Sequence, residues 1–481
     1  MSILHPNSPF RRSLSTVFSF ETAFVLYLFA GFYKSSEFLS RVPVDLTLLF
    51  LIVSVAAGGW VFWKRGYSLS RRALILVAAM AAFSGWVLLS LLWAPPTRYG
   101  LEKAIQFAVL NGWALAGAAV VMDGDRRRLR RFYGALLALA FLFALQAMRV
   151  YLPHRDVRSY IVLGASYQTV GRLVGLGFVV ALAASFSKNS RRWRTWLLLA
   201  LSLLFFFVLL IVGARGPFVA AALTTVLILV LVQRQLPLKF LFIAALAILY
   251  LAGSLWMGPS LRTMYRFNVI LAHEVGWELP GAQPSPTPLP SPTPLPTVQP
   301  TPAPKPSTPT AQSSPTAGGE TAKAATTRPA TPSPAKPKPT PRPRIPSPKD
   351  IPNKSVELRQ ERFANAWRLW LSAPLIGAGA GSFAYYYPAD QLRVYPHNII
   401  LEILSELGLV GIVLWLAMLV IAFRGFVKKG VCRRSLSIIA LGFFTFTIMN
   451  AMISGDIVSN RHVFTALGLL VATSDLWANE S

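Results

Sequence analysis

Apolar residues in this chain are gathered into runs of about twenty, and this feature limits its possible folds more than any other. A helix of that length crosses the hydrocarbon core of a bilayer. The composition agrees, because 54% of the residues are hydrophobic and only 14% are charged. A soluble domain has about a quarter of its residues charged. The sequence therefore predicts an all-α polytopic membrane protein.

The apolar runs predict about twelve transmembrane helices. We expect them to begin near Val17, Val44, Arg72, Ala104, Phe132, Ile161, Thr195, Pro217, Leu238, Ile399, Ser435 and Arg461. Residues 1–257 would then form an N-terminal membrane region, 258–397 a large external loop, and 398–481 a C-terminal membrane region. The first residues show no short apolar stretch followed by a cleavage site of small residues. We therefore expect the first span to direct insertion and no signal peptide to be removed.

Basic residues are distributed unevenly between the two sets of loops. With an even number of spans both termini lie on one side, and loops there carry the runs "KRGYSLSRR", "RRRLRR", "RRWR" and "RGFVKKGVCRR". The short loops on the other side carry scattered cations only. The positive-inside rule then predicts cytoplasmic termini and an external long loop. Most of the net charge of +28 would set topology, so nucleic acid is not a predicted partner. The single cysteine, Cys432, rules out a disulfide framework within the chain.

The external loop contains a tract rich in proline, threonine and serine at residues 281–350. Such a composition cannot bury a core, so we expect this insert to be disordered with polyproline II character. A spacer is the simplest interpretation. A glycosylated or wall-binding stalk is the alternative.

The segment after the insert, "VELRQERFANAWRLWLSAPLIGAGAGSFAYYYP", predicts a helix over about residues 355–373, ended by Pro374. At 100° per residue, Phe363, Trp367, Trp370 and Leu371 form one apolar arc. We expect this amphipathic helix to lie on the outer membrane surface. The "IGAGAG" stretch reads as a flexible glycine turn. The following tyrosines, Tyr386 among them, suit either the interfacial belt or stacking on sugar rings.

Several ionisable residues stand where lipid is expected. Arg215 lies in the tight turn "IVGARGPFVAA", and Arg172 lies with Gln168 inside the sixth span. An ionisable group at such a depth is a functional candidate. The alternatives are a snorkelling Arg215 and an ion pair between Arg172 and an acidic partner such as Glu21.

The stretch "YPHNIILEILSELGLVGIVLW" places a histidine and two glutamates at the mouth of a span. His397 lies between Pro396 and Asn398, and it has either a catalytic role or no special one. Glu402 and Glu406 are four residues apart, so they share one helical face and line the bundle interior.

Arg215, Arg359 and His397 all fall at the outer membrane boundary by the predicted topology. Two guanidinium groups suit a pyrophosphate, because each binds phosphate oxygens through a planar fork. A neutral imidazole beside them suits proton abstraction near pH 7. The external segments contain no Asp-X-Asp motif and no histidine–carboxylate cluster with metal-ligand spacing. A mechanism without metal or cofactor is therefore predicted, with arginines in place of a metal.

Three segments resemble the O-antigen ligase and polymerase family of bacterial envelope glycan enzymes. They are "RGPFVAA", "SVELRQERF…SAPLIGAGAGSF" and "HNIILEILSELGLVGIVLW". The resemblance implies a glycosyltransferase of the bacterial cytoplasmic membrane whose donor is a glycan on undecaprenyl pyrophosphate. It maps the two essential arginines of the family to Arg215 and Arg359, with Arg362 as an alternative to Arg359, and its histidine to His397. The long insert departs from the compact external domain of typical members.

The predicted reaction is attack of an acceptor hydroxyl on the anomeric carbon, with undecaprenyl pyrophosphate leaving. His397 would accept the hydroxyl proton or orient the nucleophile, and Arg215 and Arg359 would stabilise the leaving group. The residues expected to contact the substrates are Arg172, Gln168, Arg362, Tyr386, Asn398 and Glu402.

The acceptor stays open between a lipid, a glycan and a protein. An exopolysaccharide polymerase or a protein O-oligosaccharyltransferase is therefore an alternative of the same family. A transporter or flippase of lipid-linked glycans is an alternative of another class, although the unequal groups of spans on either side of the loop lack the repeated halves typical of transporters. A non-catalytic scaffold that displays the proline-rich stalk is a weaker alternative.

Overall fold

The computed structural model of the protein describes residues 19–154, 159–187, 191–232, 236–257, 262–264, 350–388, 394–426 and 434–478. Most of these residues are helical, and among them one isolated bridge between Val162 and Ala165 stands in place of any strand. The helices are α2 (Phe20–Tyr33), α3 (Leu46–Lys64), α4 (Arg71–Leu89), α5 (Arg98–Gln106), α6 (Gly112–Ala116), α7 (Arg126–Tyr151), α8 (Tyr167–Ser185), α9 (Arg192–Val212), α10 (Arg215–Leu231), α11 (Leu236–Met257), α13 (Asp350–Ser372), α14 (Ser382–Tyr386), α15 (Ile399–Phe423), α16 (Ser435–Ala451) and α17 (Arg461–Ala478).

Capping side chains fix the start of four of the long helices. Asp45, Ser70, Asp125 and Ser166 stand before α3, α4, α7 and α8, and each accepts a hydrogen bond from a backbone N–H of the first turn. These bonds satisfy donors that have no partner within the helix. Short polar residues between the apolar runs thus set where the helices begin.

Each of the twelve expected spans falls on a helix or on a chain of consecutive helices. Seven helical segments are long and apolar enough to cross a membrane, and four more apolar helices are shorter. The chain is therefore an integral membrane protein, while the count of twelve stays a prediction. The sixth helix begins at Tyr167 and not near Ile161, because Leu163 and Gly164 have left-handed backbones and form a tight turn first.

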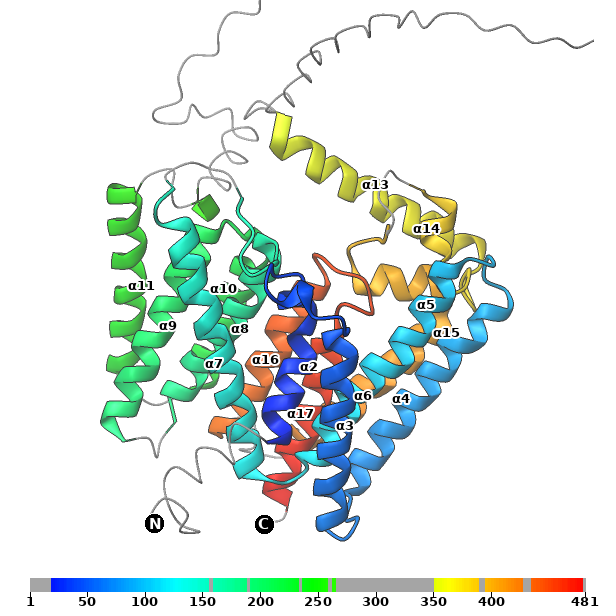
Figure 1. The fold of residues 1–481 in the computed structure, drawn as a ribbon, viewed down its shortest axis with the longest axis horizontal. Helices are drawn as coiled ribbons and strands as arrows, with labels where there is room; N and C mark the ends of the chain where they lie inside the picture. Colours follow the sequence, from blue (N-terminus) through cyan, green and yellow to red (C-terminus); the bar gives the residue numbers. More distant parts are fainter. Residues whose placement is uncertain are drawn as a thin grey trace, which may run out of the picture. The chain divides into compact units, whose positions relative to one another are not determined.

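Burial separates inner helices from lipid-facing ones. Of the seven long apolar segments, α8 is the most enclosed, and it packs against α7, α9, α10 and α16. The least enclosed is α3, which exposes apolar side chains such as Leu48 and Ile52. Figure 1 shows α3 and α4 on one side of the bundle and α11 at the opposite edge. Exposed apolar faces on outer helices are what a lipid environment requires.

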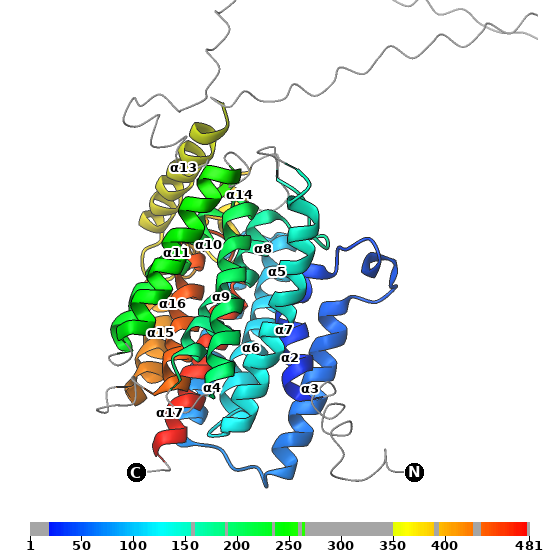
Figure 2. The ribbon, with the colours of Figure 1, turned by 90° about the vertical axis from the view of Figure 1, so that its left-hand side faces the viewer.

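The helix α13 lies obliquely at one end of the bundle (Figure 1), and Figure 2 shows the same end from the side. It ends at Ser372, as Pro374 predicts, and begins earlier than expected, at Asp350. Ala366 and Leu369 are buried, whereas Trp367 and Leu371 of the apolar arc are about half exposed. The helix therefore packs on α15 through one face and leaves the side chains of Trp367 and Leu371 exposed on another. Residues 281–349 of the predicted insert lie outside the described residues.

The expectation of a flexible glycine turn after α13 is wrong. Gly377 packs so closely that a Cβ there would lie 2.4 Å from the carbonyl carbon of Glu406. The helix α15 is broken at Gly408, whose φ is 67° and ψ −163°. Leu409 and Val410, just after the break, donate their N–H groups to the carbonyls of Pro374 and Leu375.

The same loop also satisfies acceptors before the break. The N–H groups of Ala378 and Gly379 donate to the carbonyls of Ser405 and Glu406, at 2.9 and 2.8 Å. A broken helix at membrane depth needs such partners, because lipid supplies none. The "PLIGAGAG" stretch therefore pairs with the backbone of α15 on both sides of the break. The N–H groups of Ala378 and Gly379 are engaged in these bonds, so they are not available to bind a phosphate.

We call the end of the bundle opposite α13 the basic end. It comprises residues 64–72, 122–128 and 472–475 together with the start of α2. Three arginines there form ion pairs across helices. Arg65 pairs with Asp125 at 2.6 Å, Arg72 with Asp475 at 3.1 Å, and Arg128 with Glu21 at 2.8 Å. Glu21 is thus the partner of Arg128 and not of Arg172.

Candidate active site

The loop at residues 452–460, between α16 and α17, contacts the starts of α8, α10 and α15 and the middle of the helical segment Arg98–Val121. Asn398 before α15 donates from Nδ2 to the carbonyl of Met452, and a Cβ on Gly216 of α10 would lie 3.3 Å from Ile453. Gln168 of α8 accepts from the hydroxyl of Ser454 at 3.4 Å. The side chain of Asn111 donates to the carbonyl of Ile457. Segments far apart in the sequence therefore meet around one polar loop, and we call this region the site end.

His397 is held in an uncommon backbone conformation at the site end. Its φ is 63°, in the left-handed region that non-glycine residues rarely adopt. Asn398, the next residue, caps α15 by accepting from the N–H groups of Ile400 and Leu401. The ring of Tyr395 packs edge-on against the imidazole, with centroids 4.4 Å apart. The cap, the neighbouring ring and the fixed backbone together determine where the imidazole points.

Three arginines from two helices act on the imidazole. Arg362 of α13 donates from Nη1 to Nε2 of His397. Burial, as the largest cause, and the positive charges of Arg362, Arg359 and Arg172 together lower the pKa of His397 to about 4, against an opposing effect of Asp456. The imidazole is therefore neutral near pH 7, which is the form that accepts a proton.

Three arginines at the site end differ from the paired arginines of the basic end. Among the described residues, no aspartate or glutamate forms an ion pair with Arg172, Arg359 or Arg362. Asp456 is the carboxylate whose charge acts on His397, and it is mostly buried while it accepts from the N–H of Ser459. The local charge is therefore positive, which favours an anionic ligand.

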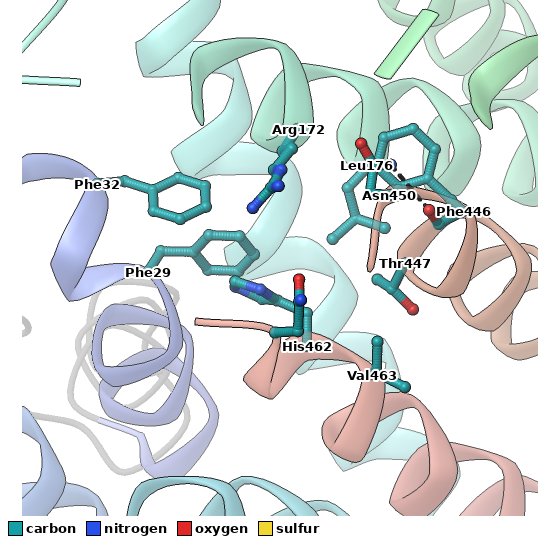
Figure 3. Close-up of a pocket in the computed structure, with 10 residues that line it drawn as sticks. Phe29, Phe32, Arg172, Leu176, Phe446, Thr447, Asn450, His462 and Val463 are labelled. Carbon is teal, nitrogen blue, oxygen red and sulfur yellow. Dashed lines mark hydrogen bonds between the residues drawn. The ribbon is translucent and has the colours of Figure 1, made fainter. Parts of the chain in front are cut away.

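Arg172 extends from α8 into a small cavity (Figure 3). The cavity of about 20 Å³ is also lined by Phe29 and Phe32 from α2, Asn450 from α16 and His462 from α17. A space of this size holds about one water molecule. Arg172 therefore acts on the site through its charge from an inner position.

Glu402 and Glu406 form a buried ion cluster below His397. The ammonium of Lys103 lies 2.6 Å from a carboxylate oxygen of Glu402 and 2.7 Å from one of Glu406. Glu406 also accepts from the N–H of Gly381 at 3.0 Å. All three side chains are about 5% exposed or less. The structure thus places the predicted substrate ligand Glu402 inside an ion pair.

The other predicted residues lie at or near the site end. Arg215 is the first residue of α10, partly buried, and the preceding Ala214 packs against Gly171 of α8. Gln168 donates to the hydroxyl of Tyr167 besides accepting from Ser454. Tyr386 is about half exposed and packs edge-on against Tyr385. The roles of all these residues stay predictions.

Sequence reasoning missed Asp456 and Lys103. Asp456 lies in "SGDIVSN", a short polar stretch between two apolar runs, and that position is the signal that could have found it. Lys103 looked like an ordinary loop cation, and nothing local marks it as a partner of residues 300 positions away. Within the described part of the chain, no group of three histidine, cysteine or acidic residues is placed to hold a metal.

A comparison with protein families gives a match. Residues 200–416 match a protein-family model described as "O-Antigen ligase". No curated protein matches the chain. The matched segment contains Arg215, Arg359 and His397, whereas Arg172 and Asp456 lie outside it.

Proposed function

The chain carries an O-antigen ligase domain at residues 200–416, and on that premise we propose that it transfers a glycan from undecaprenyl pyrophosphate to an acceptor hydroxyl. A domain of this type belongs to membrane enzymes that ligate or polymerise glycans. The donor, the acceptor and the residue roles below are parts of the proposal.

One observation carries the proposal: a neutral, partly buried imidazole lies just before the start of α15, where the charges of three arginines act on it. A pyrophosphate ester fits this charge, because guanidinium groups bind phosphate oxygens in pairs of hydrogen bonds. Its polyprenyl tail fits an apolar helical bundle. A glycan beyond the pyrophosphate would extend away from the membrane.

In the proposed reaction, the acceptor oxygen forms a bond to the anomeric carbon of the donor while the bond from that carbon to the pyrophosphate oxygen breaks. The electron pair of the broken bond leaves with undecaprenyl pyrophosphate. His397 takes the hydroxyl proton and becomes an imidazolium. Arg215 and Arg359 stabilise the charge that develops on the leaving group, which is often the largest catalytic contribution.

Arg172 adds positive charge from its inner position, and Asp456 offsets the charge of the imidazolium that forms on His397. Gln168 and Asn398 hold the loop at residues 452–460 in place through Ser454 and Met452. Glu402 keeps the start of α15 fixed through Lys103. We assign these residues to positioning, and Tyr386 to contact with the glycan.

The proposed setting is the cytoplasmic membrane of a bacterium, with both termini inside and the site end outside. The charge distribution of the loops supports this orientation. A protease added to intact spheroplasts should therefore cut the proline-rich insert. Protection of the insert in sealed cells, with cleavage after lysis, would reverse the orientation and contradict the proposed reaction compartment.

The direct test is transfer by the purified protein from an undecaprenyl-pyrophosphate glycan, with release of undecaprenyl pyrophosphate as the readout. We expect turnover to persist in the presence of a chelator, and abolition by chelator would contradict metal independence. Candidate acceptors include lipid, polysaccharide and protein hydroxyls, and the productive one separates ligase from polymerase from protein glycosyltransferase. Transport of the intact donor across a vesicle membrane without release of undecaprenyl pyrophosphate would favour the flippase alternative.

A further inference from the structure

The contact between Arg362 and His397 blocks the chemistry that the histidine is proposed to perform. A guanidinium can only donate hydrogen bonds, so the Nε2 atom that receives it must carry the lone pair. The hydrogen of the neutral ring then lies on Nδ1, which is buried and has no hydrogen-bond partner among the described residues. The single basic lone pair of the imidazole is thus already engaged.

We propose that Arg362 is a positioning residue that masks Nε2 of His397 until a diphosphate group draws the guanidinium away. The inference rests on the proposed function, since it requires a diphosphate-bearing donor. In this arrangement the base is released only when the donor is in place.

The competition favours the diphosphate on chemical grounds. A hydrogen bond between a guanidinium and a phosphate oxygen joins two opposite charges, whereas in the bond to the neutral imidazole only the donor is charged. The guanidinium can also engage two phosphate oxygens at once, whereas the imidazole offers one nitrogen. Arg359 lies one helical turn before Arg362 on α13, so both side chains can reach the same anion.

The charges that face His397 also change when a diphosphate arrives. Arg362 and Arg359 on α13 and Arg172 on α8 oppose an imidazolium, while Asp456 on the loop between α16 and α17 favours one. The ring of Tyr395 packs against the imidazole in an edge-on arrangement. A bound diphosphate offsets the arginine charges, so the pKa of His397 should rise toward its ordinary value. The donor would thus free the base and strengthen it in one event.

The proton balance is complete in this scheme. Nε2, once released by Arg362, takes the proton of the acceptor hydroxyl as the new glycosidic bond forms. The departing pyrophosphate carries the electron pair of the broken bond. The imidazolium then returns its proton to water or to the leaving diphosphate, and Arg362 bonds to Nε2 again after product leaves.

Histidine-labelled full-length protein in detergent provides the test through ¹⁵N NMR. The His397 signal is assigned by its loss in His397→Gln, and pH is titrated without ligand, with inorganic pyrophosphate and with farnesyl pyrophosphate. Without ligand, we expect Nε2 to stay unprotonated and to accept a hydrogen bond as the pH is lowered, until the midpoint at about pH 4. With either diphosphate, the midpoint should move toward about 6.5.

Arg362→Met should raise the titration midpoint of His397 without any ligand. The substitution removes both the hydrogen-bond donor to Nε2 and the positive charge with the largest effect on the ring. Arg368→Met is the matched control on the same helix, since Arg368 is exposed and bonds to Asn365 instead; it should leave the titration unchanged. These readouts do not require turnover, so a protein that fails the transfer assay but shows both shifts would contradict the proposed function and not the mask. A ligand-free midpoint near 6.5, an unchanged midpoint in Arg362→Met, or no response to either diphosphate would overturn the mask.

Discussion

The two ends of this bundle use arginine in different ways. At the basic end, Arg65, Arg72 and Arg128 each reach a carboxylate on another segment, at distances of 2.6 to 3.1 Å. At the site end, Arg362 instead donates to a neutral histidine, and the charges of Arg359 and Arg172 act on that same ring.

The difference shows that arginine density is a poor guide to a binding site. The longest basic runs of the sequence belong to the end where acids neutralise part of the charge inside the protein. At the site end, the charges of Arg172, Arg359 and Arg362 all act on one imidazole, and a bound anion would offset them. Among the described residues, an ion pair with a carboxylate separates Arg65, Arg72 and Arg128 from these three arginines.

The largest effect should come from removing charge or base at the site end. Arg215→Ala and His397→Ala should each lower the transfer rate by on the order of a thousandfold, because a preorganised donor or the proton acceptor is lost. Arg215→Lys keeps the charge but loses the planar fork, so it should be strongly impaired but less than Arg215→Ala. The measurement is the rate of undecaprenyl pyrophosphate release by purified protein. Near-normal rates in both alanine variants would sink the assigned mechanism.

A large effect on stability is expected from the ion cluster beneath the site. Lys103→Met leaves Glu402 and Glu406 buried without their cation, and removing one partner of a buried pair costs about 3 kcal/mol or more. Thermal unfolding in detergent measures the loss. Adding Glu402→Gln to Lys103→Met should restore part of the stability, because one uncompensated charge disappears. A Lys103→Met protein as stable as the wild type would show that the cluster does not support the site end.

Acid should destabilise the site end specifically. The pKa of His397 is about 4 in the folded protein and about 6.5 in an unfolded chain. Between these values the unfolded chain binds more protons, so stability falls as pH drops from about 6.5 to 4. After a discount for partial exposure, the loss between pH 7 and 5 is about 1 kcal/mol. His397→Gln should lose correspondingly less than the wild type over that range, and equal losses would show that His397 does not carry the effect.

A small effect is expected at the basic end. Arg65 and Asp125 are each about a quarter exposed, and ion pairs of this kind contribute up to about 1 kcal/mol. Arg65→Met should therefore lower the melting temperature slightly and leave the transfer rate unchanged, since the pair lies at the opposite end from His397. If Arg65→Met lowered the transfer rate as much as Arg215→Ala, the two ends would not differ in function as proposed.

The smallest effect should follow deletion of the insert. Its composition offers no means of packing a core, so removal of Pro284–Pro348 with a short flexible linker should leave transfer largely intact. The assay is the same release of undecaprenyl pyrophosphate. Complete loss of activity in a normally inserted deletion protein would show that the insert belongs to the site.

Local sequence features marked some elements of the site end. Pro374 predicted the end of α13, and the structure confirms that end at Ser372. Arg215 and His397 stood out because an ionisable group near lipid is costly. The glycine stretch was misinterpreted, because the same residues suit both a flexible turn and a tightly packed loop. Only the close neighbours of Gly377 and Gly408 distinguish the two.

The sequence by itself determined the membrane class and the helical character of this chain, because the length and apolarity of a run decide whether lipid can accept it. Tertiary structure alone decided that Lys103 joins Glu402 and Glu406, that Glu21 belongs to Arg128, and that Arg362 reaches His397. These pairings depend on which helix faces meet, and charges that lie far apart in a sequence carry no local signal of their partners. Burial and the surrounding arginines then set the pKa of His397, a property of the assembled site that the histidine and its sequence neighbours do not determine.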